Sequence, residues 1–120
     1  MSDVVVVLNG GRAVDCDTHW LGGPDFLVEI ECPDDDVEKK IPFYAKIGVR
    51  ELLIVVRDTR VLRLFRLADG TLKPVGRSAP GDPVWLASKV LPLSFRCRAN
   101  RSAPHIDVKR TDGKAGHWVV

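Results

Sequence analysis

Acidic side chains gather on one face of residues 24–32, the segment PDFLVEIEC. Along this segment apolar side chains recur with the period of two that is typical of a β-strand. The face opposite the apolar one carries Asp25, Glu29 and Glu31. Carboxylate oxygens are the ligands that Mg²⁺ prefers in proteins, so this face could hold a divalent cation. The alternative is an edge strand whose acidic side chains only face water.

The spacing of these carboxylates decides which of them can share an ion. A strand rises about 3.3 Å per residue, so the Cα atoms of Glu29 and Glu31 are expected roughly 6.6 Å apart. By the same rise Asp25 lies about 13 Å from Glu29, too far to share that ion without a bulge. A further ligand is therefore expected from a neighbouring strand. Asp3, just before the apolar run at residues 4–8, is the candidate.

A helix is predicted to follow this strand. Three aspartates at residues 34–36 supply N-cap chemistry for a helix over residues 37–47, and Gly48 is its expected C-terminal stop. Pro42 fits this helix if the regular part begins near Lys40, because the first turn does not need its missing N–H.

The other apolar runs predict strands, and the turns ADGT and TDGK predict hairpins. Residues 12–21 are mixed in character and are expected to form a connection. The predicted fold is a mixed α/β sheet with one main helix, in a single domain of residues 1–120. The predicted strands are residues 4–8, 24–32, 52–56, 61–67, 72–75, 90–97, 106–109 and 117–120.

The composition is that of an ordinary globular protein. The chain of 120 residues is 45% hydrophobic and 28% charged, which is not the composition of a disordered chain. No apolar run approaches the roughly 20 residues of a membrane helix, and the start lacks the basic region of a signal peptide. The cysteines are odd in number and scattered, which favours a reducing cytoplasm over a disulfide framework. They are Cys16, Cys32 and Cys97.

Positive charge is unevenly distributed along the chain. The formal net charge of +2 is too small to predict nucleic-acid binding by itself. Arginine nevertheless recurs at every third position in one stretch and clusters again later. These residues are Arg57, Arg60, Arg63 and Arg66, then Arg96, Arg98 and Arg101. A solvated basic surface and a nucleic-acid surface both fit this pattern.

The segments PDFLVEIECP and EKKIPFYAKIGVRELLIVV together resemble the Uma-type restriction endonucleases of the PD-(D/E)XK nuclease superfamily. The resemblance covers about residues 3–76. The family's Pro-Asp opening, central Glu, helical acid, lysine and tyrosine, and exit motif all have counterparts here. They are Pro24-Asp25, Glu29, Asp36, Lys40, Tyr44, Gly48-Val49 and Glu51, with Asp3 at the acid position of an earlier strand.

This resemblance implies a restriction-endonuclease-like core at residues 3–76, followed by a β-rich extension of hairpins at residues 77–120. The core is expected to be truncated, because the family has a longer region before its first strand. The implied activity is hydrolysis of DNA phosphodiester bonds with Mg²⁺ or Mn²⁺. The helix is expected to fold over the acidic face of the preceding strand.

The resemblance also implies the roles of individual residues. The implied catalytic residues are Asp3, Glu29 and Lys40, with Asp25 as a supporting acid. The expected metal ligands are Asp3, Glu29 and Glu31. Lys40 is expected to orient the attacking water or to neutralise charge on the phosphate, since Glu31 occupies the family's more usual lysine position; Lys39 is the fallback.

A second hypothesis is a non-catalytic interaction module that keeps the nuclease scaffold. It is motivated by the missing N-terminal region and by Val56, which stands where Asp is commoner in the family. Both hypotheses are compatible with a homodimer, because strands near the termini would leave a sheet edge for a partner to cover.

Overall fold

Two parallel strands and the helical segment that joins them form the centre of the fold. In this computed structural model, β4 (Phe26–Glu31) and β5 (Glu51–Val56) pair in parallel from Phe26↔Glu51 to Glu31↔Val56. Parallel strands need a crossover connection. Here it consists of the 3₁₀ turn η1 (Val37–Lys40) and the helix α1 (Ile41–Lys46).

The structure describes most of the chain from β4 onward and short pieces before it. For the first three ranges only the course of the backbone is described. The described residues are 4–6, 14–15, 20–21, 25–32, 34, 36–99, 102–113 and 116–119.

Three further strands complete a five-stranded sheet with the order β1-β4-β5-β6-β7. They are β1 (Val4–Val6), β6 (Leu62–Ala68) and β7 (Thr71–Ser78). The β6–β7 hairpin turns at Asp69 and Gly70, whose φ values of 53° and 77° are those of a two-residue type I′ loop. The hairpin predicted from ADGT is thereby confirmed.

A second sheet of four strands follows, with the order β11-β10-β9-β8. All its neighbouring strands are antiparallel. Its strands are β8 (Leu86–Ala87), β9 (Leu93–Arg98), β10 (His105–Arg110) and β11 (His117–Val119).

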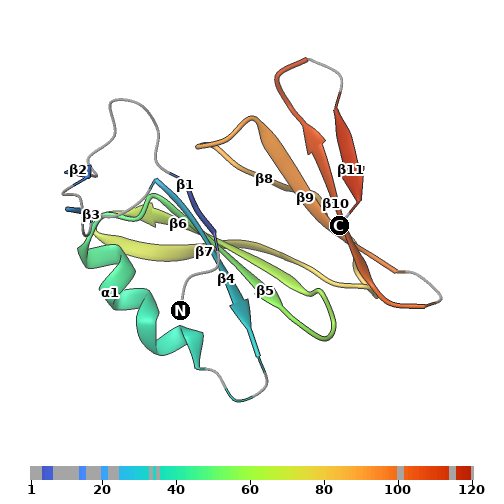
Figure 1. The fold of residues 1–120 in the computed structure, drawn as a ribbon, viewed down its shortest axis with the longest axis horizontal. Coiled ribbons are helices and arrows are strands. Elements are labelled where there is room, and N and C mark those ends of the chain that lie inside the picture. The colour runs from blue at the N-terminus through green and yellow to red at the C-terminus, as the bar shows by residue number, and fades with distance from the viewer. Residues whose placement is uncertain are drawn as a thin grey trace.

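Each face of the first sheet is covered by a different layer, with α1 on one side and the second sheet on the other (Figure 1). Apolar residues of β4, β5 and β6 therefore divide between two cores. The core under the helical segment contains Leu27, Val37, Val49, Leu52, Ile54, Phe65 and Leu72. The core between the sheets contains Phe26, Leu53, Val55, Leu62, Leu64, Leu86 and Phe95.

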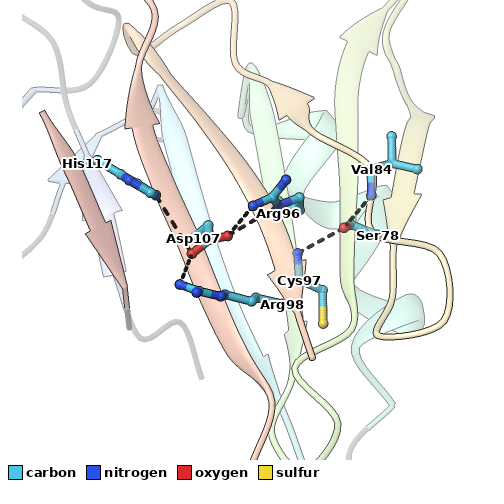
Figure 2. Close-up of polar contacts among 7 residues, drawn as sticks. All are labelled: Ser78, Val84, Arg96, Cys97, Arg98, Asp107 and His117. Atoms are coloured by element: carbon cyan, nitrogen blue, oxygen red, sulfur yellow. Dashed lines mark hydrogen bonds and ion pairs between the residues drawn. The ribbon is translucent and has the colours of Figure 1, made fainter. Parts of the chain in front are cut away.

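Buried polar contacts also join the two sheets. The Oγ of Ser78, on β7, accepts hydrogen bonds from the backbone N–H groups of Cys97, on β9, and of Val84 (Figure 2). The Sγ of Cys97 lies 3.8 Å from the carbonyl oxygen of Thr59, in the β5–β6 turn. Burial raises the pKa of the Cys97 thiol, so this cysteine is a structural thiol rather than an activated one.

The helical segment lies where a helix was predicted, at residues 37–47, and its regular part begins near Lys40 as Pro42 indicated. It starts as a four-residue 3₁₀ turn and becomes α-helical only at Ile41, with Pro42 in the first turn of α1. Proline cannot supply an N–H, so the regular helix has to begin next to it. Gly48, with φ of 88°, follows the end of α1 as predicted for a helix stop.

Two strand predictions needed correction. Residues 12–21, predicted to be a connection, contain the paired strands β2 (Val14–Asp15) and β3 (Trp20–Leu21). The strand predicted at residues 90–97 begins only at Leu93, because the Oγ of Ser88 accepts hydrogen bonds from the N–H groups of Val90 and Leu91 and holds a turn there.

The predicted class, a mixed α/β fold with one main helix, is confirmed. Among the described residues, no helix has the length and apolar character needed to cross a membrane.

Candidate active site

Glu29 lies on the face of β4 that the helical segment covers. Its neighbour on the same face, Leu27, belongs to the core under the helix, whereas Phe26 on the other face packs between the sheets. The carboxylate of Glu29 is therefore enclosed, and the residue is only 1% exposed. A buried carboxylate needs hydrogen bonds to compensate for lost hydration.

Tyr44 supplies one of these hydrogen bonds. Its phenolic O–H, on α1, donates to Oε1 of Glu29. Burial, the hydrogen bond to Glu29 and the negative charge of Glu29 together raise the pKa of Tyr44 above its ordinary value. The phenol therefore stays protonated at neutral pH, and it acts as a donor that fixes the position of the carboxylate.

The two lysines considered for catalysis differ in their surroundings. Lys39 extends into solvent with 82% of its side chain exposed, and its Nζ lies 3.5 Å from Asp36. Lys40 is partly buried at the junction between η1 and α1, one turn before Tyr44. Of the two, Lys40 is the less exposed.

Glu31, the next acid on this face of β4, is paired with an arginine. Its Oε2 lies 3.7 Å from Nη2 of Arg63, on β6. The other terminal nitrogen of Arg63 donates to Oε1 of Glu38, on η1, at 2.6 Å. Arg63 thus links β4, β6 and the helical segment at the edge of the enclosed carboxylate.

Asp25 is the acid predicted to support this site. It is buried just before β4, and Nη1 of Arg50 lies 3.5 Å from its Oδ1. The pairing of β4 with β5 has no bulge from Phe26 to Glu31. Asp25 lies just before these pairs, at a bend.

Asp3, the third acid of the predicted ligand set, lies outside the described residues. Within the ranges that the structure describes, no three His, Cys, Asp or Glu side chains are grouped closely enough to hold a metal ion. Glu29 and Glu31 are nevertheless of the ligand type that Mg²⁺ and Mn²⁺ prefer.

A row of side chains crosses the first sheet from the buried carboxylate toward the outer edge strand. Glu29 pairs with Ile54, Ile54 with Arg63, and Arg63 with Arg77 on β7. Beyond Ile54 the row opens into a groove of about 670 Å³ between the helical segment and β7. Its floor is largely apolar, and Arg63 and Arg77 stand in its wall.

A family model described as "Putative restriction endonuclease", Uma2, matches residues 2–100. The chain belongs to the Uma2 family. The match extends past residue 76, where the sequence resemblance stops, and so takes in β8 and β9 of the second sheet. No curated protein and no solved structure matches the chain.

Glu51 is a buried acid of this Uma2 chain for which the sequence predicted no contacts. It accepts hydrogen bonds from Nε of Arg66 at 2.8 Å, from Oγ of Ser88 at 2.5 Å and from the N–H of Lys89 at 2.9 Å. It shares a face of β5 with Leu53 and Val55, opposite to the face that adjoins Glu29. Glu51 therefore attaches the loop after β8 to the first sheet and lies outside the candidate site. The sequence signal that could have indicated these contacts is a glutamate at the start of an otherwise apolar strand.

Proposed function

We propose that this Uma2 protein is an endonuclease that hydrolyses phosphodiester bonds of DNA with the help of a divalent cation. The observation that carries the proposal is the enclosed Glu29 carboxylate beneath the helical segment that bears Lys40 and Tyr44. These three residues stand at positions where the sequence resembles the family's motif, and all lie within the family match.

Glu29, with Glu31 and Asp3, would hold the cation. The chemistry of the donor set supports Mg²⁺ or Mn²⁺, because all three side chains are carboxylates. When bound, such an ion polarises the scissile phosphate and lowers the pKa of the attacking water.

Tyr44 is a positioning residue in this proposal. Its hydrogen bond fixes the carboxylate of Glu29 in position on β4. Lys40 is the proposed catalytic cation, and its ammonium group neutralises charge that develops on the phosphate. Asp25, paired with Arg50, is the supporting acid.

The groove beside the site supports a polymeric substrate. It continues the row that starts at Glu29, and its apolar floor is bordered by Arg63 and Arg77. A nucleotide flanking the scissile phosphate would find an apolar surface for its base and a guanidinium for its phosphate.

Cleavage of DNA by matched variants tests the proposal. Plasmid and single-stranded DNA are incubated with pure protein and Mg²⁺ or Mn²⁺. Glu29→Gln and Lys40→Ala are expected to lower the cleavage rate by about 100-fold or more, as is usual when catalytic groups are removed. Lys39→Ala, one residue away and exposed, is the control and should cleave at the wild-type rate. Cleavage that survives both Glu29→Gln and Lys40→Ala would show a contaminating nuclease and reject the assignment.

The second candidate function is a non-catalytic interaction module that retains the scaffold. It is favoured by one observation: the carboxylate of Glu31, a proposed ligand, is already paired with Arg63, which also binds Glu38. Calorimetric titration with Mn²⁺ separates the two functions. An active site binds Mn²⁺ in a manner that Glu29→Gln abolishes, whereas the module shows no such binding.

A further inference from the structure

A cluster of cations surrounds one buried carboxylate on the second sheet, far from Glu29. Asp107, on β10, has a side chain with no exposed surface. Its Oδ2 accepts hydrogen bonds from Nε and Nη2 of Arg96 at 3.2 and 2.6 Å. Its Oδ1 lies 3.4 Å from Nη1 of Arg98 and 3.8 Å from Nε2 of His117. Figure 2 shows the three basic side chains converging on Asp107 from β9 and β11.

These side chains point away from the core between the sheets. Asp107 pairs directly with Arg96, so the two share a face. Their sequence neighbours Phe95, Ile106 and Val108 occupy the opposite face, which packs in the core between the sheets. The first sheet and the second sheet thus both lie between this surface and α1. We call the surface formed by Arg96, Arg98, Lys109 and His117 around Asp107 the cationic face.

Trp85 holds two of its cations in place. The Cζ of Arg96 lies 4.4 Å from the ring centroid of Trp85, and Nζ of Lys109 lies 4.0 Å from the same centroid. Both distances are within the range of a cation–π interaction. Lys109 is two residues from Asp107 along β10 and therefore on the same face.

The cationic face has more positive charge than its one acid can balance. Three positive charges, those of Arg96, Arg98 and Lys109, face one negative charge, that of Asp107. The excess of two equals the formal net charge of the whole chain, +2. Arg98 and His117 approach the carboxylate only loosely, and their side chains remain 53% and 57% exposed. Both side chains can therefore donate hydrogen bonds to an external anion.

We infer that the cationic face binds the phosphate backbone of DNA, as a second contact separate from the catalytic side. Guanidinium groups match the oxygens of phosphate and carboxylate in a forked geometry, and the proposed function selects phosphate as the anion. Arg96 and Arg98 are two residues apart, so their Cα atoms are about 6.6 Å apart along β9, a separation comparable with that of successive phosphates on one strand. The identification of the polyanion as DNA rests on the proposed function. The presence of an anion site rests only on the charges and exposure of the cationic face.

The test measures DNA binding without cleavage. Fluorescence anisotropy of a short labelled duplex is followed over a series of salt concentrations in EDTA. The variant Arg98→Gln/Lys109→Gln removes two charges but leaves Arg96 on Asp107, so the buried carboxylate keeps its closest partner. The control Lys46→Gln/Lys73→Gln removes two charges from exposed positions on α1 and β7.

Arg98→Gln/Lys109→Gln is expected to weaken binding by roughly tenfold or more at low salt, and to reduce the slope of log K against log salt by about 2. The control should retain the wild-type slope. Because the assay is free of hydrolysis, a failure of the nuclease proposal in the Glu29→Gln experiment leaves this result unchanged.

Three outcomes would overturn the inference. The first is absence of DNA binding by the wild type, or binding that Arg98→Gln/Lys109→Gln does not weaken. The second is an equal loss in the control, which would reflect net charge alone. The third is binding of polyglutamate that is as tight as binding of DNA and depends on the same two residues. This result would mean that the surface binds an acidic protein.

Discussion

The phenol of Tyr44 reaches across from α1 to hydrogen-bond the buried carboxylate of Glu29 on β4. This contact attaches the helical segment to the strand that it covers. It also connects the stability of the fold with the geometry of the proposed site, so both properties should respond to changes at Tyr44.

Removing the Tyr44 hydroxyl should destabilise the protein. Tyr44→Phe leaves one oxygen of a buried carboxylate without this donor, at a cost of about 1–3 kcal/mol in the free energy of unfolding. Urea titration followed by circular dichroism measures the change. Phe43→Leu is the matched control, since Phe43 is 57% exposed and its replacement should cost far less. Equal losses in the two variants would contradict a role for the hydrogen bond.

Alkaline pH should weaken the same contact. Because the pKa of Tyr44 is raised in the folded protein, the folded state binds the phenolic proton more tightly than the unfolded state does. The resulting stability is fully present below the unfolded pKa of about 10 and is lost as pH rises above it. The free energy of unfolding, measured between neutral pH and about pH 11, should therefore fall less steeply in Tyr44→Phe than in the wild type.

Releasing Glu31 from its arginine should strengthen metal binding if Glu31 is a ligand. A cation has to compete with Arg63 for this carboxylate. The pair is partly exposed and worth about 1 kcal/mol or less, so Arg63→Gln should tighten Mn²⁺ binding by up to about fivefold in calorimetric titration. Weaker binding would mean that Arg63 supports the site instead of competing with the metal.

Acid should destabilise the second sheet through Asp107. Burial alone would raise the pKa of Asp107, but the hydrogen bond from Arg96 and the charges of Arg98, Arg96 and His117 lower it below the ordinary value. The contribution of Asp107 to stability is thus present above the unfolded pKa of about 3.9 and is lost as pH falls through the lower, folded value.

Asp107→Asn tests this contribution at neutral pH. We expect a loss of about 2–3 kcal/mol, less than for a fully buried pair because both arginines remain partly in water. The variant should also lose less stability than the wild type on acidification, as measured by urea titration at several pH values. Asp69→Asn, whose carboxylate is 93% exposed, should match the wild type throughout.

Local sequence signals predicted the parts of the fold that depend on near neighbours. Alternation predicted β4 and its acidic face, the residues ADGT predicted the β6–β7 hairpin, and Gly48 predicted the end of the helix. The prediction that the helical segment covers the acidic face of β4 agrees with the contact between Tyr44 and Glu29. The 3₁₀ start was missed because the position of Pro42 allows more than one boundary.

The contacts that the sequence did not predict depend on strand order and register. Arg63 meets Glu31 only because β5 lies between β4 and β6 with no shift in the intervening pairs. Asp107 meets Arg96 through the antiparallel register of β9 and β10, and no local pattern marks that partnership. The roles of Glu29, Lys40 and Asp25 in catalysis, and the ligand set that includes Asp3, stay predictions.

The position of Cys97 makes its thiol a natural probe for separation of the two sheets. Its thiol is enclosed where β9 meets Ser78 and the β5–β6 turn, so an alkylating reagent should reach it only in molecules whose two sheets have come apart. The modified peptide is identified by its mass. The rate of alkylation at Cys97 would then measure how often the two sheets separate, and no label has to be introduced.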